Sequence, residues 1–117
     1  MIENSIARRY ARALIAVAQD EKKVDEFGLE LTSFYEVCLK TQGAFDVLKN
    51  RDLDLSARLR AVDQISVKLG LAVSVKNLLK LLLRKGRFDL LPVVVSEYGV
   101  IAHKVMGRTV MQVVSAN

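Results

Sequence analysis

The segment formed by residues 77–92 most strongly constrains how this chain can fold. Five of the eight residues 77–84 are leucine, which is too many for a helix with only one buried side. Gly86 then supplies a helix stop, Asp89 a candidate N-cap, and Pro92 a residue suited to the first turn of a following helix. The segment therefore predicts a helical hairpin whose first arm is apolar around more than half of its circumference.

Apolar residues recur at helical spacing along the rest of the chain as well. The first helix is expected to begin at Asn4 or Ser5, the fourth after Asp52 or Asp54, and the fifth at Ser74, since all of these are good N-cap residues. Gly70, Gly86 and Gly107 are expected stops for the last three helices. The predicted helices cover residues 5–19, 24–39, 44–49, 55–69, 75–85 and 90–106.

The composition agrees with long regular elements. Apolar residues make up 51% of the 117 residues, and only one proline and six glycines interrupt them. No apolar run approaches the roughly 18 residues of a membrane span. The expected fold class is all-α, a compact six-helix bundle.

The last residues break this pattern. Residues 109–114 are rich in β-branched side chains and lack a helical period, so they predict a short strand. One strand cannot satisfy its own backbone. We therefore expect its sheet to belong to sequence beyond Asn117, with residues 1–106 forming a helical N-terminal domain and residues 107–117 opening a truncated C-terminal domain. The alternative is a tail that pairs between copies of the chain.

Residue types needed for catalysis or metal binding are sparse. There is no Gly-rich phosphate loop, and His103 and Cys38 are the only histidine and cysteine. His103 is expected at the boundary of the core, and Cys38, among apolar neighbours, inside it. A lone cysteine excludes an intramolecular disulfide and fits a reducing compartment. We expect no catalytic, cofactor-binding or metal-binding residues and no enzymatic activity, although a small helical enzyme is a remaining alternative.

Charge is distributed unevenly along the chain. Residues 20–36 carry a local balance of −4, whereas residues 76–87 contain five bases and no acid, within a net charge of +5. Such a distribution can orient a partner or bind a phosphate backbone. The simpler alternative is a solvated basic helix face beside a solvated acidic one.

Two helices have more apolar surface than one core requires. The first presents Tyr10, Ala13, Leu14 and Val17, and the fifth has a surplus around Leu81. Asn77 and Arg84 flank Leu81 by one turn on either side. An apolar stripe with a polar rim is typical of a groove that binds a partner helix. Alternatively, all of these leucines belong to the core of a central helix.

Four ordered blocks of sequence resemble the delta subunit of F-type ATP synthases, called the oligomycin-sensitivity-conferring protein in mitochondria. The blocks are Arg-Tyr-Ala-Arg-Ala-Leu at 9–14, Asn-Leu-Leu-Lys-Leu-Leu at 77–82, Gly-Arg at 86–87 with Leu-Leu-Pro at 90–92 and Tyr98, and Gly107 with Val-Val-Ser-Ala at 113–116. The resemblance implies a six-helix N-terminal domain on top of the catalytic head, whose first and fifth helices bind the N-terminal helix of an alpha subunit. By position, it implies that Tyr10 and Leu14 line one wall of that groove, and Asn77, Leu81 and Arg84 the other.

The same resemblance implies a non-catalytic stator subunit that takes part in ATP synthesis and hydrogen ion transport without a cofactor. Its C-terminal domain, absent here, would engage the b-subunit peripheral stalk. The lack of a transit-like N-terminus favours a bacterial protein, peripheral to the cytoplasmic face of the inner membrane. The alternative function is an RNA-binding helical bundle of the transcription-antitermination type, with the N-terminal arginines and the basic fifth helix contacting phosphates.

Overall fold

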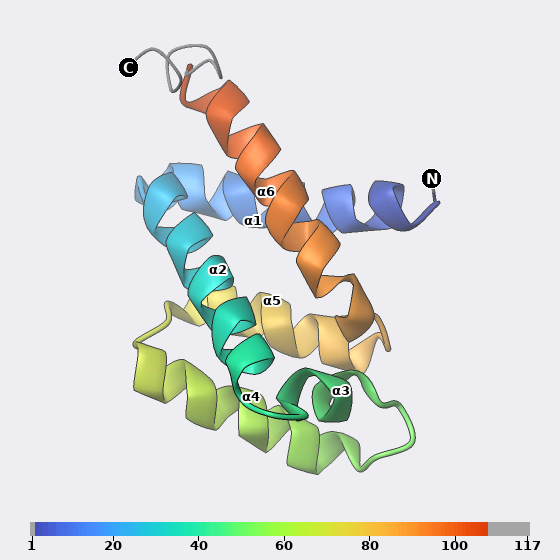
Figure 1. The fold of residues 1–117 in the computed structure, drawn as a ribbon. Helices are drawn as coiled ribbons and strands as arrows, with labels where there is room; N and C mark the ends of the chain where they lie inside the picture. The colour runs from blue at the N-terminus through green and yellow to red at the C-terminus, as the bar shows by residue number, and fades with distance from the viewer. Residues whose placement is uncertain (1, 108–117) are drawn as a thin grey trace.

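The computed structural model of the chain describes residues 2–107. This part of the chain forms six α-helices and one short 3-10 helix, without a strand (Figure 1). The elements are α1 (Ile2–Glu21), α2 (Val24–Lys40), α3 (Ala44–Lys49), α4 (Leu55–Leu69), α5 (Val73–Arg84), η1 (Phe88–Leu90) and α6 (Leu91–Val105). The prediction of an all-α six-helix bundle is confirmed. The predicted strand at 109–114 lies outside the described residues, and the division into two domains stays a prediction.

The first and last helices form the most extensive contact in the bundle. Figure 1 shows α6 crossing α1 in the upper half, with α4 and α5 below them. Ala7, Ala11 and Ala18 of α1 are fully buried, and these small side chains allow the close approach. At the edge of the contact, Arg8 Nε donates a hydrogen bond to Glu97 Oε1 over 3.1 Å. The apolar positions that periodicity predicted on α1 thus face the core, apart from Ala13 and Val17, which are exposed.

A tyrosine on α6 forms a hydrogen bond with the backbone of α2. Tyr98 is 2% exposed, and its hydroxyl donates a 2.6 Å hydrogen bond to the backbone carbonyl of Val24. A Cβ atom added at Gly28 would lie 3.0 Å from Cε1 of the Tyr98 ring, so only glycine allows this approach. Burial, together with the negative charges of Asp25, Glu26 and Glu30, raises the pKa of Tyr98 to about 12. The hydroxyl therefore remains a proton donor at neutral pH.

Several helix ends lie where the sequence predicts them. Asp54 Oδ2 accepts a hydrogen bond from the Ala57 N–H over 3.1 Å, so Asp54 rather than Asp52 caps α4. Gly70 ends the same helix with φ of 68°, a conformation in which a side chain is unfavourable. Residues 93–95 are helical in spite of their three valines, and Pro92 lies in the first turn of α6.

Three predicted helix starts are wrong. The first helix begins at Ile2, and Asn4 and Ser5 lie inside it. Ser74 does not cap α5: the helix begins one residue earlier, and a carboxylate oxygen of Glu30 on α2 accepts the Ala72 N–H over 2.7 Å. Asp89 does not cap α6, because it lies within η1, which inserts an extra turn before the helix. In the case of α5, a contact between distant helices replaces the local cap.

The only cysteine lies in the core, as predicted. Cys38 is 1% exposed, and burial raises the pKa of its thiol from 9.0 to about 11. At pH 8 the native protein should therefore hold about 100-fold less thiolate than the unfolded chain, since the pKa difference is about two units. We expect a thiol-specific disulfide reagent to modify Cys38 at least about 100-fold more slowly in the native protein than in urea. Equal rates would contradict a buried thiol.

Candidate functional site

An open apolar furrow lies between α1 and α5. Its volume is about 270 Å³. Leu81 and Val17, one on each wall, remain 36% and 38% exposed, although both are large aliphatic residues. The residues that line the furrow are Ala13, Leu14 and Val17 from α1, and Ser74, Asn77, Leu78 and Leu81 from α5.

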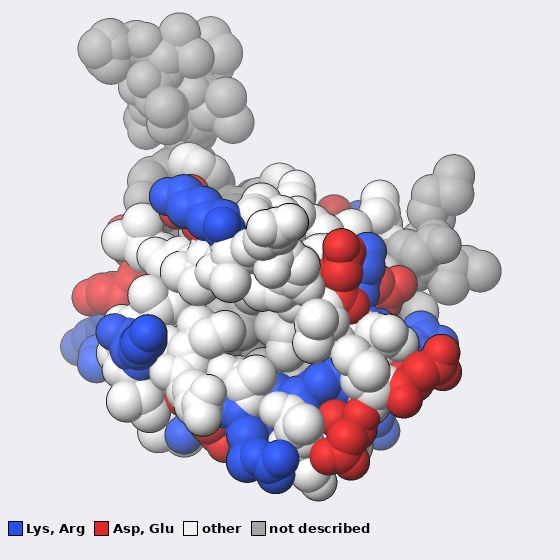
Figure 2. All heavy atoms as spheres, turned by 60° about the horizontal axis from the view of Figure 1, so that its bottom comes forward, with Lys and Arg blue, Asp and Glu red and all other residues white. Residues whose placement is uncertain are grey.

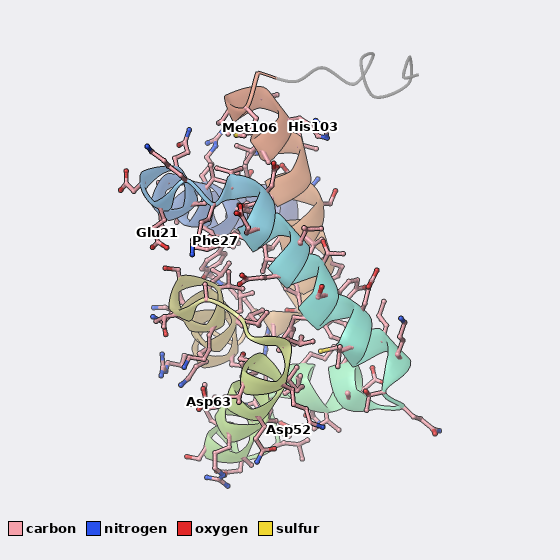
Figure 3. The ribbon with its side chains drawn as sticks, turned by 90° about the vertical axis from the view of Figure 1, so that its left-hand side faces the viewer. Glu21, Phe27, Asp52, Asp63, His103 and Met106 are labelled. Atoms are coloured by element: carbon pink, nitrogen blue, oxygen red, sulfur yellow. The ribbon has the colours of Figure 1, made fainter. Side chains whose placement is uncertain are left out.

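The two walls run in opposite directions. Arg87 Nη1, just beyond the end of α5, donates a hydrogen bond to the hydroxyl of Tyr10 over 3.2 Å. This contact places the C-terminal end of α5 beside the first half of α1. Figure 3, a side view, shows α1 and α5 together on one side of the bundle and α2 with α6 on the other. The furrow therefore lies on the side of the molecule away from the α2–α6 pair.

The surplus of leucine on α5 explains why the furrow exists. Leu78, Leu79, Leu82 and Leu83 are all buried, whereas Leu81 points between α5 and α1 towards solvent. A 12-residue helix with five leucines in its last seven residues cannot bury all of them against one core. The alternative in which every leucine of this helix belongs to the core is therefore wrong for Leu81.

The structure brings together three of the five predicted site residues. Leu14, Asn77 and Leu81 line the furrow, whereas Tyr10 and Arg84 do not. Tyr10 is half-buried and bonded to Arg87 beyond one end of the furrow, and Arg84 is exposed at the last position of α5.

Four lining residues were missing from the predicted site. They are Ala13, Val17, Ser74 and Leu78. Ala13 and Val17 were predicted on the apolar face of the first helix but not among the five site residues. Helical spacing could have found the other two, since Ser74 lies three residues before Asn77 and Leu78 three before Leu81. Ser74 was misassigned because its position next to a predicted helix start suggested a capping role.

The basic segment at 76–87 does not form a continuous cationic surface. Lys80 Nζ lies 3.1 Å from Asp63 Oδ1 on α4, and Arg87 bonds to Tyr10. On the face shown in Figure 2, acidic and basic side chains are interspersed around a largely uncharged middle. None of the seven aromatic side chains, all within the described range, is exposed for stacking on a base. These observations weigh against the RNA-binding alternative.

The other cavities and buried polar groups of the described residues do not form a second candidate site. A cavity of about 360 Å³ lies between α2 and α6 beside Gly28, Gly99 and His103. Nδ1 of His103 is buried there without a hydrogen-bond partner, while the side chain as a whole is partly exposed. In the described range, no three His, Cys, Asp or Glu side chains are grouped as a metal site would require. None of the described helices is long and apolar enough to cross a membrane.

Comparison with known proteins identifies the family. The family model for the ATP synthase delta (OSCP) subunit matches residues 6–117. The chain is 37% identical over 107 residues to the ATP synthase subunit delta of Geotalea uraniireducens and 36% identical over 107 residues to that of Geobacter metallireducens. Each alignment covers 92% of this chain and 59% of the relative. The subunit delta of Myxococcus xanthus is 34% identical over 118 residues, which cover 99% of this chain and 65% of that protein.

The chain thus spans less than two thirds of the length of these relatives. The match nevertheless extends over nearly all of the chain, including both walls of the furrow. It confirms the resemblance that the sequence blocks indicated. The chain belongs to the ATP synthase delta (OSCP) subunit family.

Proposed function

We propose that this chain is a non-catalytic stator component of an F-type ATP synthase and that its furrow binds the amphipathic N-terminal helix of an alpha subunit. Membership of the delta family supports the stator role. The proposed binding of a helix rests on the open furrow itself, in which Leu81 and Val17 stay exposed on facing helices. A partner helix would remove this apolar surface from water, and such burial stabilises a complex.

The dimensions of the furrow suit two turns of a helix. From Ser74 to Leu81 the wall formed by α5 rises by about 10 Å, at about 1.5 Å per residue. Apolar anchors at positions i, i+3 or i+4, and i+7 of a partner span the same length. Asn77, exposed at the middle of this wall, offers both a donor and an acceptor to fix the register of the partner. Leu14, Leu78 and Leu81 would contact the anchors.

The proposed role is mechanical. During rotary synthesis the catalytic head must be held still while the central shaft turns, and a helix held in an apolar furrow can resist torque without reacting. In this proposal the subunit lies peripherally, on the cytoplasmic face of a bacterial inner membrane. Contact with the b-subunit stalk would come from a C-terminal domain that is not part of the 117 residues. No cofactor and no nucleic acid enter the proposal.

Calorimetric titration of the chain with a synthetic peptide of the alpha subunit N-terminus tests the proposal. We expect saturable one-to-one binding with a negative heat-capacity change, because apolar surface is buried. The affinity should change by less than about 10-fold between 50 and 200 mM salt, whereas a protein with six to ten phosphate contacts loses about 10³- to 10⁵-fold. Absence of peptide binding would refute the proposal, and salt-sensitive binding of single-stranded RNA would favour the alternative.

A further inference from the structure

The two ends of the furrow carry opposite charge. On α1, helical spacing continues from Leu14 and Val17 to Asp20 and Glu21 at the end of the helix. Figure 3 places Glu21 on the side of the molecule where α5 lies. We call Asp20 and Glu21 the acidic end.

At the opposite end, the stripe on α5 continues from Leu81 to Arg84, the last residue of the helix, and to its C-cap Lys85. The hydrogen bond between Arg87 and Tyr10 shows that this part of α5 lies beside the first half of α1, away from Glu21. We call Arg84 and Lys85 the basic end. The furrow thus runs from a pair of carboxylates to a pair of cations over its whole length.

These four charged side chains are available to a partner. All of them are exposed, and none takes part in an ion pair with another residue of the described range. The exposed Lys22 and Lys23 lie in the turn between α1 and α2, and Lys22 lines a different cavity beside Met106. The macrodipoles of α1 and α5 largely cancel at both ends, because the two helices run in opposite directions. The side-chain charges therefore determine the potential along the furrow.

We infer, on the basis of the proposed function, that the furrow accepts its helix in one polarity only: the N-terminus of the partner lies at the basic end and its C-terminus at the acidic end, antiparallel to α5. Natural helices carry acidic residues in the first turn and basic residues in the last. At each end of such a partner helix, the full charges of these side chains are larger than the half-charge of the helix dipole and have the opposite sign. The partner is therefore an amphipathic helix with an acidic first turn, and complementary ends fix its direction.

Spin labels on the peptide report its direction. A nitroxide is attached to a cysteine added at either the N-terminal or the C-terminal end of the alpha peptide, and amide signals of the isotope-labelled chain are recorded. We expect the N-terminal label to broaden the signals of Leu81 and Lys85, and the C-terminal label to broaden those of Val17 and Glu21. The opposite pattern, or equal broadening of both ends by each label, would overturn the inferred polarity and leave the proposed function standing. Absence of any shift in furrow signals would instead refute peptide binding and, with it, the polarity.

Charge reversal provides a second, independent measurement. The double variant Arg84→Glu with Lys85→Glu should weaken the peptide about 3- to 30-fold at low salt, and less at high salt, because two attractive pairs become repulsive. Lys40→Glu with Lys68→Glu changes the net charge equally on exposed residues of α2 and α4 outside the furrow, so its affinity should stay within about 2-fold. Equal losses in both double variants would overturn the inference, because only net charge would then matter. An unchanged affinity in the first variant would overturn it as well.

Discussion

Replacing Leu81 with glutamate is expected to weaken binding of the alpha-subunit peptide by about 30- to 1,000-fold, a loss of about 2–4 kcal/mol. Leu81 is the last residue of the α5 wall and one of the exposed apolar side chains of the furrow, and the variant would force a carboxylate into a furrow that the partner helix dehydrates. The domain itself should remain folded, because the side chain is 36% exposed and can turn towards water in the free protein. Titration calorimetry measures the affinity, and circular dichroism the helix content.

A matched control comes from the same helix. Val73 is 66% exposed on α5 and does not line the furrow, so Val73→Glu introduces the same charge without entering the proposed interface. We expect its affinity to lie within about 2-fold of the wild-type value. If Leu81→Glu bound the peptide as tightly as Val73→Glu, the assignment of the furrow would be wrong.

Truncation of Tyr98 is expected to cause the largest loss of stability. Tyr98→Ala removes a fully buried ring and should lower the free energy of unfolding by about 3–5 kcal/mol. Tyr98→Phe keeps the ring but removes the hydroxyl that donates to the Val24 carbonyl, at a cost of about 1–2 kcal/mol. Urea unfolding followed by circular dichroism gives both values. Equal stability of the phenylalanine variant and the wild type would show that the 2.6 Å hydrogen bond contributes nothing.

A pair of glycine variants separates packing around Tyr98 from helix propensity. Both glycines lie inside helices, where alanine is favoured by up to about 1 kcal/mol. Gly99→Ala should raise the free energy of unfolding by up to that amount, since an added Cβ meets no atom within 4 Å. Gly28→Ala should instead destabilise the domain, because its Cβ would press on the tethered Tyr98 ring at 3.0 Å. The same unfolding experiment applies, and a more stable Gly28→Ala variant would mean that the ring moves freely.

The fold could be predicted from the sequence as far as it depends on periodicity. The apolar spacing located all six helices, including residues 93–95, because a helix must bury a continuous stripe whatever its neighbours are. The starts of α5 and α6 could not be predicted in this way. The cap of α5 comes from Glu30, 42 residues away, and η1 before α6 packs Phe88 edge-on against Phe34. Both depend on tertiary contacts that local patterns do not contain.

The furrow was predictable for a related reason. An excess of leucine over what one core can bury identified α5, and Leu81 is the leucine that remains exposed. The place of Tyr10 could not be foreseen, because its hydroxyl accepts a hydrogen bond from Arg87, 77 residues later in the chain. The acidic and basic ends likewise became visible only once the antiparallel arrangement of α1 and α5 was known.

The packing of α1 against α6 has a consequence for the synthesis of the protein. As the chain leaves the ribosome, α1 emerges before the other described helices, and α6, with which it forms its most extensive contact, emerges after them. The core stays incomplete until α6 has left the exit tunnel, so the domain should acquire protease resistance in one late step. Until then, the apolar side of α1 is accessible to chaperones.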